Sequence, residues 1–292
     1  MYAAISGLEA SQTMLDVTAN NLANSDTIGY KSASTSFVDE LSQTLAAPTG
    51  PNSFSAGTNA QQVGLGVQVG SIDNNMGTGS LQTTGHALDV AINGAGFFQV
   101  GNGQPGNTGP YTSGLPTDTQ YTRAGNMTLN SQGFLTTQNG EYVIGSTDPS
   151  SNAAAQPCYI NVPPGSTNVA VGQDGSVSYT DENQSNPTYG QTVIAGYISL
   201  ATFPNSAGLS RAGSSMWDRT PASGPLSGAV QTATPGLSGL GATISGSLEM
   251  SNVDMATEFT NMITAERTYQ ANSKVITTGD NMLSTLVNMV QG

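Results

Sequence analysis

The chain has 292 residues, with 6 Lys and Arg against 19 Asp and Glu, which gives a formal net charge of -13. We therefore expect no nucleic acid partner, because such binding relies on cations at phosphates. We also expect no membrane insertion, because no apolar run reaches the length of a membrane span. One Cys and one His argue against a disulfide framework, a structural zinc site and a His-based catalytic triad.

Residues 1–24 predict the first element, a helix. Leu8, Leu15 and Leu22 recur every seven residues, a spacing that keeps one stripe facing a partner helix. The segment lacks the basic start and the continuous apolar core of a secretory signal. We therefore expect no cleaved signal peptide.

The middle of the chain predicts strands. Apolar residues alternate with polar residues or Gly over 63–69, which is the period of a half-buried strand. Asn93-Gly94 follows an apolar run and predicts a hairpin with 97–100, and residues 169–179 predict another hairpin. Short strands at this spacing indicate a β-rich, sandwich-like or barrel-like domain.

Residues 252–290 predict a second helix, roughly 58 Å long at 1.5 Å per residue. Ser251, three residues before Asp254, resembles the start of a capping box. The apolar stripe of this helix consists of Met255, Phe259, Met262, Tyr269, Ile276, Leu283 and Val290. The amino-terminal helix covers about half of such a length, so the rest needs the middle domain or another subunit. The heptad spacing favours packing between subunits.

These elements predict an α+β protein whose terminal helices pair as a coiled-coil domain beside a β-rich middle. We expect the following division: a helical core at 1–30 and 251–292, an extended linker at 31–70, a β-rich domain at 71–145 and 190–250, and a small β insertion or loop lobe at 146–189.

The sequence predicts no catalytic, cofactor-binding or metal site, and we expect a protein that is not an enzyme. Gly94-Ala95-Gly96 lacks the third Gly and the following helix of a phosphate-binding loop. Several acidic residues lie in turns, where the side chain bonds local backbone. An enzyme acting on polysaccharide would need two close acids in an aromatic cleft. A monomeric surface-binding module is an alternative, in which the terminal helices pack on their own β domain.

Residues 19–31, ANNLANSDTIGYK, resemble the amino-terminal signature of the bacterial flagellar axial proteins, the rod and hook subunits. Residues 61–100 and 121–145 resemble the first β domain of that family, and 247–289 resemble its terminal helix. The signature residues are Asn20, Asn21, Asn24, Gly29 and Lys31. The resemblance implies an inner helical layer around a narrow channel, β domains outside it, and the helix stripes as packing between subunits.

Within that family, residues 256–263 and 270–278 look more like a hook subunit than a rod subunit. A hook is the universal joint between rod and filament and serves motility. The alternative is a distal rod subunit, because only 146–190 is available for the outer domain that typical hook proteins insert. The resemblance also implies a helical homopolymer that meets rod, hook-cap and hook-filament junction proteins. It further implies export by the flagellar type III apparatus to the extracellular part of the flagellum.

Overall fold

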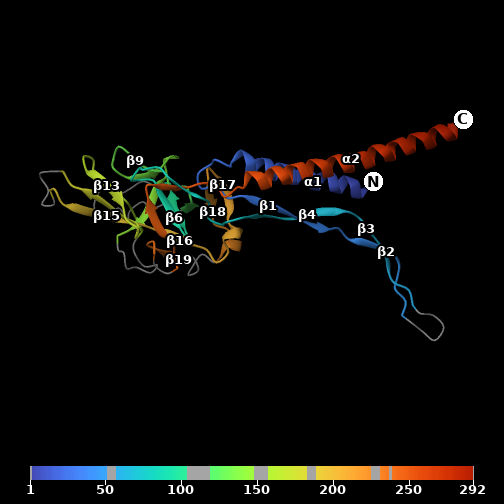
Figure 1. The fold of residues 1–292 in the computed structure, drawn as a ribbon. Helices are drawn as coiled ribbons and strands as arrows, with labels where there is room; N and C mark the ends of the chain where they lie inside the picture. The colour runs from blue at the N-terminus through green and yellow to red at the C-terminus, as the bar shows by residue number, and fades with distance from the viewer. Residues whose placement is uncertain are drawn as a thin grey trace. The chain divides into compact units, whose positions relative to one another are not determined.

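The computed structural model describes residues 2–50, 57–103, 119–147, 157–182, 189–224, 231–236 and 239–291 (Figure 1). The chain forms two compact units: one comprises Met1–Ser25, Ser32–Asn75 and Val253–Gly292, and the other comprises Asp26–Lys31 and Met76–Asn252. The expected α+β architecture is confirmed, because the two terminal helices pair and the middle is β-rich. In the part of the chain that the structure describes, no helix is both long and apolar enough to cross a membrane.

The first unit is a helix pair with two β-ribbons. It contains α1 (Tyr2–Ala23), β1 (Ala33–Asp39), β2 (Ser42–Ala46), β3 (Gln61–Gly64), β4 (Val67–Asn74) and α2 (Met255–Gln291). The helices run antiparallel, since Gly7 lies against Asn272 and Asn21 bonds Glu258. β1 pairs with β4 and β2 pairs with β3, both antiparallel. The expected linker, residues 31–70, therefore contains three whole strands of this unit.

Asp254 caps the start of α2. Its Oδ1 accepts hydrogen bonds from the backbone N–H groups of Ala256 at 3.0 Å and Thr257 at 3.4 Å. Its Oδ2 accepts the Thr257 hydroxyl at 3.0 Å. The prediction of Ser251 as the capping residue is wrong, and α2 begins at Met255, because the Asp254 carboxylate satisfies the otherwise unpaired first-turn N–H groups.

The second unit is built on one antiparallel sheet. Its short strands are β5 (Leu81–Thr83), β6 (Val90–Asn93), β7 (Phe97–Gly101), β8 (Thr119–Thr122), β9 (Met127–Leu129), β10 (Leu135–Thr137), β11 (Tyr142–Ser146), β12 (Pro157–Tyr159), β13 (Thr167–Val171), β14 (Ser176–Thr180), β15 (Thr192–Ile198), β16 (Leu200–Thr202), β17 (Ser210–Gly213), β18 (Met216–Asp218), β19 (Gln231–Ala233), β20 (Ala242–Ser245) and β21 (Ser247–Glu249). The main path of the sheet runs β13-β14-β15-β11-β7-β8-β18-β17. The pairs β20-β6 and β21-β5 stand apart from it.

Two hairpin predictions have different outcomes. The hairpin over 169–179 is confirmed, since β13 pairs with β14. The hairpin at Asn93-Gly94 is wrong, because β6 pairs with β20 whereas β7 pairs with β8, β11 and β16. A Cβ on Gly94 would lie 2.9 Å from the Cα of Gly241, so this turn passes against the backbone of a distant segment.

Residues 157–182 of the expected 146–189 lobe form β12, β13 and β14, which extend the same sheet through β11 and β15. Residues 148–156 and 183–188 of that range lie outside the described residues. The main core of the unit is a cluster of aliphatic and aromatic side chains that includes Phe98, Val143 and Ile198. A smaller cluster gathers around Trp217 and Phe97.

Candidate assembly surfaces

The contact row of α1 is made of small and polar residues. Gly7, Ser11, Thr18 and Asn21 are buried, and their spacing of four, seven and three residues is that of a heptad seam. A Cβ on Gly7 would lie 2.6 Å from Asn272 Nδ2, so the two helices approach closely at this point. At this point the two helices therefore meet through a glycine and an amide side chain and not through leucines.

Asn21 joins three elements of the first unit. It is fully buried. Its Nδ2 donates to the backbone oxygen of Ala33 at 2.7 Å and to Glu258 Oε1 at 3.0 Å, and its Oδ1 accepts the Ala33 N–H at 3.0 Å. An amide side chain supplies a donor and an acceptor together. Asn21 thus ties α1, β1 and α2 to one another.

Two more signature residues shape the end of α1 and the turn after it. Asn24 donates from Nδ2 to the Asn20 backbone oxygen at 2.9 Å, and its own backbone N–H donates to the same oxygen at 3.2 Å, so the side chain adds a second hydrogen bond at the end of α1. Gly29 has a φ of 68°, and a Cβ there would lie 2.6 Å from the backbone nitrogen of Ala124. Both the conformation and the close approach require glycine. Asn20 itself is exposed.

Lys31, the last signature residue, belongs to a buried ionic cluster in the second unit. Its Nζ donates to Glu249 Oε1 at 2.5 Å and to the Gly77 backbone oxygen at 2.8 Å. Arg123 donates from Nη1 to Glu249 Oε2 at 3.0 Å. The exposed fractions of the three side chains are 0% for Lys31, 3% for Arg123 and 0% for Glu249. Within the described part of the chain, the ion pairs are Lys31–Glu249 and Arg123–Glu249.

The cluster fastens together three segments that are distant in sequence. Glu249 also accepts the Gly79 N–H at 2.9 Å, and its backbone oxygen accepts the Gly29 N–H at 2.8 Å. Segments 26–31, 76–79 and 247–252 each adjoin a point where the chain passes between the two units. Burial lowers the pKa of Lys31, against the opposing effect of Glu249. Burial likewise lowers the pKa of Arg123.

The last part of α2, from about residue 278 to Gln291, has no facing turn of α1. Gly7 faces Asn272 and Asn21 faces Glu258, a separation of 14 residues on each helix, so α1 reaches only to about residue 277. Figure 1 shows α2 extending past the amino-terminal end of α1. The exposed apolar residues on this extension are Met282, Leu283, Leu286, Val287 and Met289, each more than half exposed.

These five side chains share one face. At 3.6 residues per turn they fall within an arc of about 160°, whereas Ser284, Thr285 and Asn288 lie opposite. Between residues 278 and 291 the sequence has one charged residue, Asp280. An apolar face of this kind on a long helix is typical of a surface that another helix covers.

The predicted packing residues occupy mixed environments. Leu8, Leu15 and Leu22 are half-buried and lie one position beyond the contact row of α1. Met262 and Ile276 are half-buried as well, whereas Met255, Phe259, Tyr269 and Leu283 are between 41% and 51% exposed. The side chain of Val290 lies outside the described residues. Packing of this set between subunits stays a prediction.

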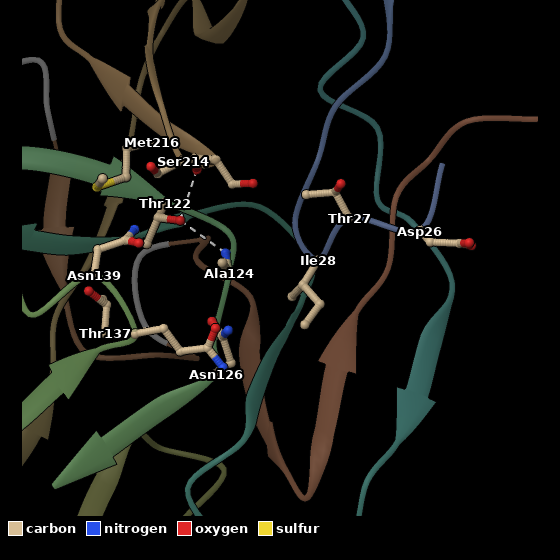
Figure 2. Close-up of a pocket in the computed structure, with 12 residues that line it drawn as sticks. Asp26, Thr27, Ile28, Thr122, Ala124, Asn126, Thr137, Asn139, Ser214 and Met216 are labelled. Atoms are coloured by element: carbon tan, nitrogen blue, oxygen red, sulfur yellow. Dashed lines mark hydrogen bonds between the residues drawn. The ribbon is translucent and has the colours of Figure 1, made fainter. Parts of the chain in front are cut away.

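A cavity of about 410 Å³ in the second unit is lined by uncharged polar residues together with Asp26, Ile28, Ala124 and Met216 (Figure 2). Thr27 and Ile28 come from the segment after α1, and Thr122 and Thr137 come from β8 and β10. Thr122 Oγ1 donates to the Ser215 backbone oxygen at 2.9 Å and accepts the Ala124 N–H at 3.0 Å, as Figure 2 shows.

Sequence reasoning missed Arg123 and Glu249. They stand 92 and 218 residues after Lys31, on separate segments, so no local spacing could link them. The one available signal was an arginine within an alternating strand pattern of a chain with only 6 Lys and Arg. A buried arginine needs a carboxylate partner.

Paired terminal helices with an exposed apolar end are typical of a protein that packs against other chains. Family models match three parts of the chain: residues 1–31 match the flagella basal body rod protein, residues 91–179 match the D1 domain of flagellar hook protein FlgE/F/G, and residues 244–289 match the C-terminal part of flagellar basal body rod FlgEFG protein.

Full-length relatives agree. The flagellar basal-body rod protein FlgG of Bacillus subtilis is 40% identical over 289 residues, covering 99% of this chain and 98% of the relative. FlgG of Caulobacter vibrioides is 37% identical over 284 residues, covering 96% and 95%. The flagellar hook protein FlgE of Salmonella typhimurium is 27% identical over 418 residues, covering 98% of each. The chain belongs to the bacterial flagellar rod and hook protein family, whose members are structural proteins of the flagellum and its basal body.

Proposed function

We propose that this chain is a distal rod subunit of the flagellar basal body, which polymerises with copies of itself into a straight helical tube. The length of the chain is the observation that supports a rod subunit. The FlgG relatives align end to end with this chain, whereas the alignment with FlgE spans 418 positions for a chain of 292 residues. The relatives thus favour the rod over the hook subunit that the sequence led us to expect.

The exposed apolar end of α2 supplies the contact for polymerisation. Leu283 and Leu286 are 51% and 57% exposed, so a neighbouring copy that covers them gains for each roughly half of the about 1.5–3 kcal/mol that full burial of an exposed leucine supplies. The subunits are exported without a cleaved signal and assemble outside the cytoplasm. The neighbours of the tube are other rod proteins and the hook.

The test is polymerisation of the purified full-length chain, followed by sedimentation and electron microscopy. We expect straight tubes. The double variant Leu283→Gln/Leu286→Gln should raise the critical concentration at least about tenfold. The control Ser284→Gln/Asn288→Gln makes the same change of residue type on the polar face and should leave it nearly unchanged.

The three hypotheses, a rod subunit, a hook subunit and a monomeric surface-binding module, predict different results in this assay. Curved tubes would favour the hook subunit. A stable monomer with both helices formed would favour the surface-binding module, in which the apolar face has no partner of its own kind. Equal effects of the two double variants would show that the apolar face of α2 is not part of the contact between subunits.

A further inference from the structure

The two helices of the first unit carry opposite charges on their outer sides. The charged residues of α1 are Glu9 and Asp16, both acidic, and the basic residues of α2 are Arg267 and Lys274. All four side chains are exposed. Within the described residues the ion pairs are those of Glu249, so none of these four charges is paired inside the chain.

Glu9 and Asp16 form an acidic row on the side of α1 that faces away from α2. At about 100° per residue, Glu9 stands about 200° around the helix from Gly7, which lies against Asn272 of α2. Asp16 follows Glu9 by seven residues and keeps nearly the same angle. The two carboxylates therefore point away from the helix contact.

Arg267 and Lys274 form a basic row on the outer side of α2. Arg267 stands two residues after Ala265, which is 1% exposed, and Lys274 stands two residues after Asn272. Each base is thus about 200° around the helix from a residue on the buried side. One edge of the helix pair is acidic and the other is basic, so the rows of one chain cannot meet each other.

The two rows have the same spacing, seven residues or about 10.5 Å. In an antiparallel arrangement, the register that places Glu9 beside Lys274 therefore also places Asp16 beside Arg267. Within one chain, the contacts between α1 and α2 put residue 9 level with residue 270. A neighbour that pairs both rows is thus shifted by four residues, about 6 Å along the helix axis.

We propose that the acidic row of each copy docks on the basic row of the next copy, with Glu9 beside Lys274 and Asp16 beside Arg267. This contact rests on the proposed function and specifies how neighbours meet in the polymer. The two rows are different surfaces of one chain, so the contact is heterologous and repeats from copy to copy. The axial shift at each step favours a helical filament over a closed ring.

The charged contact and the apolar contact lie on opposite sides of α2. Leu283 follows Lys274 by nine residues, which is about 180° around the helix, so one copy can meet different neighbours through the two surfaces. Exposed ion pairs add little affinity, whereas complementary charges select the partner and its register. The rows thus fix the register, the apolar end supplies the burial, and the net charge of -13 still sets the response of polymerisation to salt.

Charge reversal tests this contact in the polymerisation of the full-length chain. Glu9→Lys/Asp16→Lys or Arg267→Glu/Lys274→Glu sets like charges opposite each other, and each double variant alone should raise the critical concentration about tenfold. An equimolar mixture of the two should polymerise like wild type, because every row then meets its opposite. The chain with all four substitutions keeps the net charge of -13 and should also polymerise like wild type.

Net charge alone predicts a different result. Two changes from -1 to +1 in the acidic row take the net charge from -13 to -9, which would weaken the repulsion between copies and lower the critical concentration. An unchanged or lower critical concentration for the acidic-row variant would overturn the proposal. So would a fourfold variant that is as impaired as the double variants.

Disulfide cross-linking tests the register without a polymer. Gln12 and Gln270 are exposed and uncharged, and each follows the first charge of its row by three residues. In the proposed register they lie on the same flank, so Gln12→Cys and Gln270→Cys on separate chains should link. Gln12→Cys with Thr277→Cys is displaced by one heptad and should link at least about fivefold more slowly. Cys158 is buried and does not compete.

The two experiments separate this contact from the proposed function. If wild type forms no polymer, the proposed function fails, and cross-linking still decides the contact: equal rates for the two cysteine pairs would overturn it. If wild type polymerises but neither charge reversal impairs it, the contact is wrong and the proposed function stands. Peptide mass mapping identifies the linked residues.

Discussion

At the scale of single residues, the buried Asn21 side chain joins three elements of the first unit. Asn21→Ala would leave the Ala33 N–H and C=O groups and Glu258 without their amide partner. We expect a loss of about 2–3 kcal/mol in the free energy of unfolding, because buried groups would lose their hydrogen bonds. Urea unfolding followed by circular dichroism measures it.

The adjacent residue provides the control for this change. Asn20 is exposed, so Asn20→Ala should alter the free energy of unfolding by no more than about 0.5 kcal/mol. Equal losses for the two variants would mean that the family signature acts through helix propensity and not through the Asn21 hydrogen bonds.

Glu249 has a comparable role in the second unit. Glu249→Gln would leave Lys31 and Arg123 buried without a countercharge. Removing one partner of a buried ion pair costs about 3–5 kcal/mol, and we expect a loss of that size in urea unfolding. Asp26→Asn removes one negative charge from an exposed position of the same unit and should change little. A small effect of Glu249→Gln would show that the cluster tolerates its own charge excess.

The lowered pKa of Lys31 makes stability depend on pH. In the folded chain this pKa lies below the unfolded value of about 10.4, so between the two values the unfolded chain binds more protons. The free energy of unfolding therefore rises with pH across that window. The difference between wild type and Lys31→Met should shift in favour of wild type from about pH 7 to about pH 10. A pH-independent difference would contradict this assignment.

At the scale of elements, the close contact of Gly7 with Asn272 sets the spacing of α1 and α2. In wild type, Gly7→Ala gains helix propensity but places a Cβ against the Asn272 amide. In the Asn272→Ala background that obstacle is gone, so Gly7→Ala should stabilise the helix pair by up to about 1 kcal/mol. A double-mutant cycle in thermal unfolding gives the coupling. No coupling would mean that the helices do not meet at this point.

The same contact explains how far the sequence could predict this fold. Both helices were predictable because heptad spacing is local. The contact row of α1 was not, because Gly7, Ser11, Thr18 and Asn21 are small or polar and carry no hydrophobic signal. The hydrophobic pattern shows only the neighbouring row of Leu8, Leu15 and Leu22, whose packing between subunits stays a prediction. Likewise, Asn93-Gly94 looks like a hairpin turn locally, but the pairing of β6 with β20 depends on a segment far along the chain.

At the scale of the whole molecule, electrostatic repulsion between copies opposes the apolar contact that we propose on α2. Each copy has a net charge of -13, so copies repel one another as they assemble. The proposed contact on α2 has one charged residue between 278 and 291, which leaves little scope for attractive ion pairs there. Polymerisation should therefore be driven by apolar burial and resisted by long-range repulsion.

Salt should then promote assembly up to a limit. The screening length falls from about 30 Å at 0.01 M to about 10 Å at 0.1 M and about 3 Å at 1 M. We expect the critical concentration to drop several-fold over the first tenfold increase in NaCl and to level off as repulsion is screened. Pelleting across an NaCl series measures it. A critical concentration that rises with salt would indicate ion pairs between subunits, whereas a steady fall without a plateau would indicate salting out of apolar surface.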